Sequence, residues 1–135
     1  MPFMTWTDKL SVGVKVFDDD HKKLIGTLNQ LNDGMKAGHG KEVLEKVLAE
    51  LVDYTKFHFA REEETFAKTG YPEAATQKKQ HAELVKRVLE MQARFKKGEL
   101  TLSLEVMDFL KDWLINHIQG TDKKYGPFLN AKGIL

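Results

Sequence analysis

Four stretches of this chain repeat their apolar residues every three or four positions, with short breaks between them. Such spacing places one apolar stripe on a helix, so residues 19–119 are predicted to form four amphipathic helices. The breaks lie at residues 38–40, at residues 70–72 and at Gly98. Because short connections between helices of similar length make neighbours antiparallel, we predict an all-α, up-down-up-down four-helix bundle.

The ends of the helices are predicted from capping and helix-breaking residues. Asp18 or Asp19 is expected to cap the first helix, and Thr101 or Ser103 the fourth. The second helix is expected to run from about Lys41 to Lys68, since an apolar stripe continues over that length. Gly120 and then Pro127 are expected to end the fourth helix.

The segment before the first helix is expected to lie against the bundle. Val12, Val14 and Val16 alternate as in a β-strand, but an isolated strand has no partner, so an extended N-terminal arm along the bundle is expected. A chain of 135 residues corresponds to one domain. The expected parts of residues 1–135 are an arm at 1–18, four helices at 19–119 and a C-terminal tail at 120–135.

Composition restricts the partners and the kind of site. The longest apolar run is far shorter than the ~20 residues of a membrane-spanning helix, so no membrane insertion is expected. The net charge of +1 with mixed signs argues against nucleic acid. Residues 1–9 lack the pattern of a secretory signal, so a cytoplasmic protein is expected. Without cysteine, any metal must be bound through nitrogen and oxygen.

Four of the five histidines lie on the apolar stripes. His21 and His81 lie near the starts of the first and third helices, and His58 and His117 lie near the ends of the second and fourth. In an antiparallel bundle these four places meet at one end. The fifth, His39, lies between two glycines and is expected to be exposed in a turn.

Two carboxylates join this predicted layer. Glu62 follows His58 by four residues, so both side chains leave nearly the same helix face. Asp122 follows His117 by five residues and must reach back from a loosened helix end, for which Gly120 gives the freedom. Burying four imidazoles and two carboxylates is costly without a compensating charge. The layer therefore favours a metal cluster over a purely structural polar layer.

The number and type of these side chains indicate two metal ions. A single zinc needs about four ligands and would leave part of the set unused. Histidines around two carboxylates that span a pair of cations are typical of a non-haem di-iron centre in a bundle core. Gln77 precedes His81 by one turn, where a third helix-borne nitrogen ligand would be expected.

The ordered motifs resemble the hemerythrin family, and in particular its single-domain bacterial members. Myohemerythrin is a known example of the up-down-up-down topology. The resemblance covers nearly the whole chain, and the ordered series is far more specific than any one motif. The motifs are Trp6, Asp18-Asp-Asp-His21-Lys-Lys-Leu24, His58-x-x-x-Glu62, Gly70-Tyr71-Pro72, His81, Trp113-Leu-Ile-Asn-His117-Ile and Asp122-Lys-Lys-Tyr125.

What the resemblance implies is reversible dioxygen binding at two non-haem iron ions joined by an oxo or hydroxo bridge. By position it assigns Glu62 and Asp122 as bridging carboxylates. It assigns His21 and His58 to the iron that receives oxygen. His81 and His117 are assigned to the other iron, with Gln77 beside them. Apolar side chains would protect the bound oxygen. The candidates for this wall are Leu114, Phe57, Trp113 and Ile118, and ordinary core packing explains Phe57 and Ile118 equally well.

Gln77 departs from the family pattern, which has histidine four residues before His81. The amide oxygen of Gln77 can ligate iron weakly or accept a hydrogen bond from a metal-bound water. Three outcomes follow: a working centre with a Gln77 or water ligand, a second open position with peroxidase-like or oxidase-like reactivity, or weak loading of one metal. We expect two irons to be retained and the oxygen chemistry to be perturbed.

Two functions of different classes are compatible with these residues. The first is an oxygen-binding protein for storage, delivery or sensing, expected to be a monomer that is not an enzyme and that supplies oxygen-requiring enzymes. The alternative is a di-iron enzyme that reduces peroxide, oxygen or nitric oxide, or a ferritin-like iron handler. Ferritin-like sites are built mostly from glutamate, so a histidine-rich layer favours oxygen binding.

Overall fold

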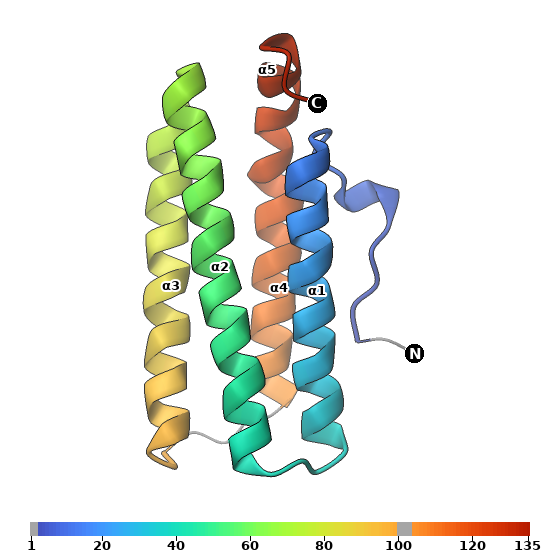
Figure 1. The fold of residues 1–135 in the computed structure, drawn as a ribbon, viewed down its shortest axis with the longest axis vertical. Coiled ribbons are helices and arrows are strands. Elements are labelled where there is room, and N and C mark those ends of the chain that lie inside the picture. The colour runs from blue at the N-terminus through green and yellow to red at the C-terminus, as the bar shows by residue number, and fades with distance from the viewer. Residues whose placement is uncertain (1–2, 100–103) are drawn as a thin grey trace.

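The chain folds into four long helices that pack side by side (Figure 1). The computed structural model describes residues 3–99 and 104–135, and none of these residues forms a strand. The helices are, in chain order, α1 (Lys15–Lys36), α2 (Lys41–Thr69), α3 (Ala74–Lys96) and α4 (Leu104–Gly120). Each runs opposite to the one before it, which confirms the predicted up-down-up-down bundle. Within the described ranges, no helix has the length and apolarity that crossing a bilayer requires.

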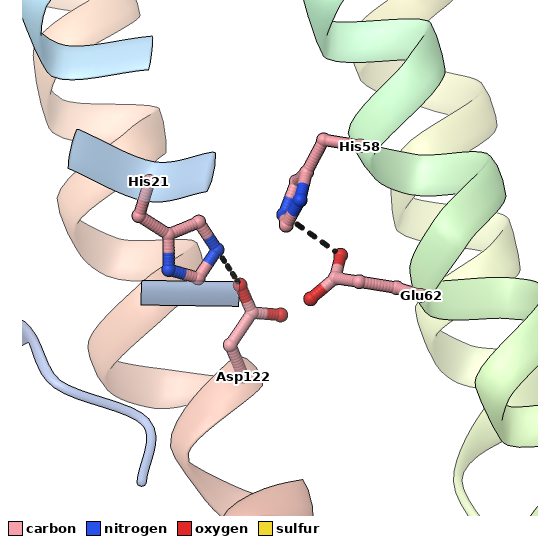
Figure 2. Close-up of side chains that lie close together, drawn as sticks. All are labelled: His21, His58, Glu62 and Asp122. Carbon is pink, nitrogen blue, oxygen red and sulfur yellow. Dashed lines mark ion pairs between the residues drawn. The ribbon is translucent and has the colours of Figure 1, made fainter. Parts of the chain in front are cut away.

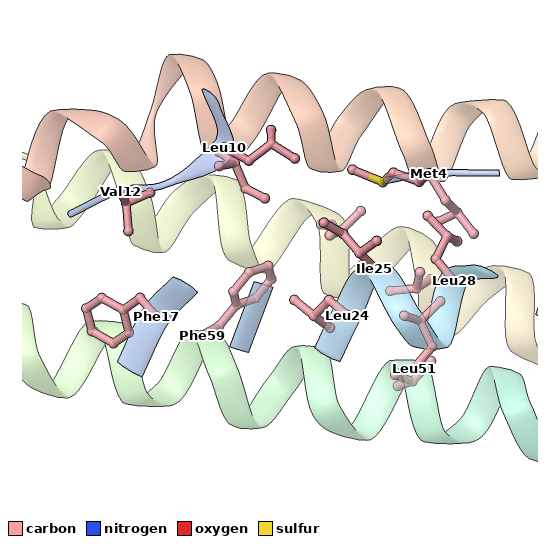
Figure 3. Close-up of a cluster of buried hydrophobic side chains, with 14 of the residues drawn as sticks. Met4, Leu10, Val12, Phe17, Leu24, Ile25, Leu28, Leu51 and Phe59 are labelled. Atoms are coloured by element: carbon pink, nitrogen blue, oxygen red, sulfur yellow. The ribbon is translucent and has the colours of Figure 1, made fainter. Parts of the chain in front are cut away.

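The core lies where the apolar stripes of the helices meet. Figure 3 shows Phe17, Leu24 and Leu28 of α1 facing Leu51 and Phe59 of α2. All five side chains are buried. Complete burial of a side chain of this size contributes about 1.5–3 kcal/mol, so these stripes supply much of the driving force for the bundle.

The N-terminal arm lies against the bundle, as expected, but it is not extended throughout. Its middle forms a short 3₁₀ turn, η1 (Asp8–Leu10). Met4 and Val12 bury their side chains in the core (Figure 3). Asn29 holds the arm by accepting a hydrogen bond from the Met4 backbone N–H and donating one to the Met4 carbonyl, at 2.8 and 2.7 Å. The arm therefore packs as part of the domain.

Helix α1 begins before the predicted cap, so the expectation of an Asp18 or Asp19 cap is wrong. The residue before the helix is Val14, and no side chain caps it. Asp18 instead accepts hydrogen bonds from the Ser11 hydroxyl at 2.6 Å and the Val12 N–H at 2.8 Å. Its carboxylate lies in the first turn, where the helix dipole favours a negative charge, and joins the arm to α1. The predicted caps at residues 101 and 103 lie outside the described residues.

The predicted C-terminal tail also folds. After α4 the chain forms a 3₁₀ turn, η2 (Asp122–Lys124), and a short helix, α5 (Tyr125–Ala131). Helix α4 ends at Gly120, as predicted, so Pro127 is not what ends it. Pro127 lies in the first turn of α5, where a missing N–H costs nothing. Gly126 packs on the arm so closely that a Cβ there would collide with the Val12 carbonyl. This contact holds α5 over the end of the bundle.

Candidate metal centre

The four histidines predicted to meet do come together, in one buried layer near the ends of α2 and α4. His21 comes from α1, His58 from α2, His81 from α3 and His117 from α4, and at most 5% of any of them is exposed. His39 is exposed, as expected. The apolar periodicity of each helix turns these imidazoles inward, because each continues the stripe of its own helix.

Glu62 and Asp122 lie between the imidazoles. The Oε1 atom of Glu62 is 3.2 Å from His58 Nε2 and 3.3 Å from His81 Nε2. Asp122 reaches the two other rings, with Oδ2 3.2 Å from His21 Nε2 and Oδ1 3.0 Å from His117 Nε2. Figure 2 shows His21, His58 and both carboxylates converging. Each carboxylate therefore contacts one histidine of each predicted pair.

The break after α4 is what brings Asp122 into the layer. Helix α4 ends at Gly120, and Asp122 opens the η2 turn with its side chain completely buried. Had α4 continued as a regular helix, a residue five positions after His117 would have faced away from it. The predicted loosened helix end is thus present in the structure.

The layer suits bound cations on the chemistry of its donors. None of the four histidine Nε2 atoms has a hydrogen-bond partner among the described residues, and all are buried. Donor atoms that lie within 4.8 Å of one another form two groups: His21, His58, Glu62 and Asp122, and His81, His117 and Asp122. Buried imidazole and carboxylate donors without partners are costly, and metal ions would satisfy them. The residues present therefore fit a pair of metal ions.

Three of the imidazoles are oriented by acceptors on their outer side. The Nδ1 atom of His58 lies 2.9 Å from the Asp20 carboxylate, and the Nδ1 atom of His81 lies 3.0 Å from the Glu63 carboxylate. The Nδ1 atom of His117 lies 2.9 Å from the side-chain amide oxygen of Gln80. Each partner atom can only accept, so Nδ1 carries a proton and Nε2 is the nitrogen left to bind a metal ion. The predictions from sequence did not include these partners.

Of these acceptors, Asp20 has the most hydrogen-bond partners. Its carboxylate also accepts hydrogen bonds from the Tyr54 hydroxyl at 2.8 Å and from Arg61 at 2.7 and 3.1 Å. Burial alone would raise the pKa of Asp20, but the hydrogen bonds of His58 and Tyr54 and the charge of Arg61 hold that pKa below its ordinary value. Asp20 therefore stays ionised beside His58.

Tyr125, the first residue of α5, is joined to the centre. Its hydroxyl donates a 2.6 Å hydrogen bond to Oε2 of Glu62. Burial and the negative charges of Glu62 and Asp122 raise the pKa of Tyr125 well above its ordinary value. The phenol therefore keeps its proton and holds the second oxygen of Glu62, while the first faces His58 and His81.

Burial of charge in the layer is offset by pairing. Burial would raise the pKa of Glu62, but the charge of His58 and the close contacts with the rings of His58 and His81 hold it well below its ordinary value. Burial would lower the pKa of His58, but the charge of Glu62 and the hydrogen bond to Asp20 raise it to about 10. In the metal-free protein His58 therefore carries a proton that an incoming metal ion must displace.

Gln77 is also part of the layer. Its side chain is completely buried, and Nε2 donates a 3.0 Å hydrogen bond to Oδ1 of Asp122. Its Oε1 atom has no hydrogen-bond partner within the described part of the chain. All seven residues predicted to form the metal site thus lie together.

An apolar cavity of about 40 Å³ adjoins the layer on its inner side. Trp113 and Leu114 of α4 line it, together with leucines of the other helices. The prediction for Phe57 is wrong, because 52% of its side chain is exposed and its ring packs under Arg61. Ile118 is buried but does not line the cavity, so its role is core packing.

Comparison with known proteins supports the geometry. Residues 12–129 match the family model described as "Hemerythrin HHE cation binding domain". The chain is 40% identical to bacteriohemerythrin of Stenotrophomonas maltophilia, over 97% of this chain and 84% of that protein. It is 38% identical to bacteriohemerythrin of Methylococcus capsulatus, over 97% and 100% of the two chains. A solved structure of wild-type hemerythrin aligns with a TM-score of 0.89 at 36% identity, over 93% of this chain and 96% of that one.

Proposed function

The chain belongs to the hemerythrin family, and we propose that it binds dioxygen reversibly at two non-haem iron ions held by the buried histidine layer. The observation that carries this proposal is the pairing of two buried carboxylates with four buried imidazoles whose Nε2 atoms lack partners among the described residues. The family match over residues 12–129 supports the choice of iron and of dioxygen.

We propose that the layer divides into two iron positions. His21 and His58 would hold one iron, and His81 and His117 the other. Glu62 and Asp122 would bridge them, and the support is that each carboxylate contacts one histidine of each pair. Gln77 would border the second position.

The iron pair, when bound, supplies the electrons for oxygen binding and a position at which oxygen can bind. The chain's own residues prepare and protect that position. Asp20 and Glu63 orient His58 and His81 through their Nδ1 atoms, and Tyr125 restrains Glu62. Trp113 and Leu114 border an apolar cavity, which excludes water and stray protons from the centre.

The ligand set favours oxygen binding over the alternative functions. Di-iron enzymes and iron-handling proteins of the ferritin type use mainly carboxylates, often with Glu-x-x-His pairs. Here the two groups of donor atoms contain four histidines and two carboxylates. Storage or delivery of oxygen to oxygen-requiring enzymes, a monomeric state and a cytoplasmic location remain predictions.

Oxygen equilibrium measured by absorbance tests the proposal. Protein loaded anaerobically with ferrous iron should change its visible spectrum on exposure to oxygen and regain the original spectrum under argon. His117→Ala removes an imidazole from the centre and should abolish the change, whereas His39→Ala alters an exposed histidine and should leave it intact. Irreversible oxidation of the wild type in a single exposure would contradict the proposal.

A further inference from the structure

The amide of Gln77 has only one workable orientation. An ionised carboxylate accepts hydrogen bonds and cannot donate them, so the atom that faces Asp122 must be the amide nitrogen. Nε2 lies 3.0 Å from Oδ1 of Asp122, in agreement. The oxygen on the same amide carbon is therefore the atom left over, buried and without a hydrogen-bond partner among the described residues.

The two sides of the layer share the same kinds of strong donors. Around His21 and His58, two imidazoles and two carboxylates offer donor atoms within 4.8 Å of one another. Around His81 and His117, the corresponding group adds Asp122, and Glu62 Oε1 lies 3.3 Å from His81 Nε2. Gln77 lies beside this second group, but a neutral amide oxygen binds iron more weakly than an imidazole. With Gln77 as a weak donor, the second side therefore has no more strong donors than the first, and it leaves one position open.

One ligand would fill the open position and also pair with the Gln77 oxygen. A solvent molecule bound at the second iron would complete its ligands and donate a hydrogen bond to Gln77 Oε1. Two carboxylates do not neutralise the charge of two iron ions, so the net positive charge also favours binding of an anion at the position of this solvent molecule. The side chains of Gln77, His81 and Asp122 are 0–2% exposed, which restricts the place to small ligands.

From these contacts we propose that the His81–His117 side of the centre carries an exchangeable solvent ligand beside Gln77, and that small monoanions such as azide replace it. The inference rests on the proposed di-iron function. It gives this chain two exchangeable positions per centre: the oxygen position at the His21–His58 side, and one created by Gln77. Gln77 acts there as a positioning residue that holds Asp122 with its nitrogen and the solvent with its oxygen.

Calorimetric titration of azide into the ferric holoprotein tests the inference. The wild type should bind two azide ions per centre. Gln77→His places an imidazole one turn before His81, so that variant should bind one. Gln77→Leu removes the amide without adding a nitrogen donor, so it should still bind two, with weaker affinity at the second position because the hydrogen bond from the amide side chain is lost. Circular dichroism melting curves of the three proteins establish that each is folded.

A wild type that binds a single azide, as Gln77→His does, would overturn the inference, and so would a Gln77→Leu variant that binds only one. Iron content and the reversal of oxygen binding, measured on the same samples, test the proposed function separately. If the wild type binds two irons and binds oxygen reversibly but takes up one azide, the proposed function stands and the second exchangeable position is refuted.

Discussion

Tyr125 and Glu62 are joined by a 2.6 Å hydrogen bond that ties the last helix to the metal layer. This contact explains why the segment after α4 folds instead of trailing as a tail. The tyrosine is completely buried, and its ring packs edge-on against Phe17 of α1, with 5.4 Å between centroids. The hydroxyl therefore has a fixed position from which it restrains one oxygen of Glu62.

Tyr125→Phe should lower the free energy of unfolding of the metal-free protein by about 1–3 kcal/mol, because Glu62 Oε2 is left buried without its donor. Urea denaturation followed by circular dichroism measures the change. Tyr71→Phe is the control, since no hydrogen bond joins Tyr71 to Glu62 in the described residues, and it should cost clearly less. Equal losses in the two variants would show that the phenol has no particular role at Glu62.

Asp20→Asn should weaken iron binding by about 10- to 100-fold, because the outer partner of a ligating histidine orients the ring and raises its basicity. The substitution also leaves Arg61 without its buried carboxylate. Competition with a chelator measures the affinity. Asp19→Asn changes the neighbouring exposed carboxylate and should leave the affinity unchanged. An unchanged affinity in Asp20→Asn would remove Asp20 from the account of the site.

The stability of the metal-free protein should depend on pH in both directions. Pairing raises the pKa of His58 from 6.5 to about 10, so its stabilising contribution is complete below pH 6.5 and is lost as the pH rises towards 10. The pKa of Glu62 is held well below 4.5, so its contribution is present above that pH and is lost on acidification. Burial and the charge of Glu62 would raise the pKa of Asp122, but close contacts with the rings of His117 and His21 hold it below 3.8.

The metal-free protein should therefore be most stable between about pH 5 and 6.5. Urea denaturation at intervals from pH 4 to pH 10 checks this maximum. Iron replaces the proton on His58, so the loss above pH 6.5 should be reduced in the loaded protein. Rising stability of the metal-free protein between pH 7 and 9 would contradict the charge states assigned to the layer.

Gly126→Ala should destabilise the protein by about 1–3 kcal/mol, because the added methyl group would collide with the Val12 carbonyl and push α5 away from the arm. Gly26→Ala is the matched control. Its Cβ would meet nothing within 4 Å on an exposed face of α1, so that variant should be stabilised by about 0.5–1 kcal/mol. Urea denaturation measures the free energy of unfolding of both variants. Changes of similar size and the same sign in the two variants would contradict the close contact at Gly126.

Periodicity predicted the helices well, because each apolar stripe is long. Helix α2 was expected at Lys41–Lys68 and runs over Lys41–Thr69. The same stripes carried the four histidines to one end, which required only antiparallel neighbours. The place of Asp122 in the layer was predicted from its spacing to His117 and from Gly120 between them.

The outer residues of the site were beyond such reasoning. Asp20 stands in a run of three aspartates, and only the rotation of α1 selects it over Asp19 to face His58. Tyr125 lies within one of the motifs, but its hydrogen bond to Glu62 depends on α5, which was not predicted within the C-terminal tail. These contacts join residues 38 and 63 positions apart and arise from packing, not from local pattern.

Anomalous diffraction at the iron edge from crystals of the loaded protein tests the central claim most directly, because it locates the metal without assumptions about ligands. We expect two iron peaks in the buried layer, one next to His21 and His58 and one next to His81 and His117, with Glu62 and Asp122 touching both. A single peak in the layer, or iron bound elsewhere on the chain, would contradict it.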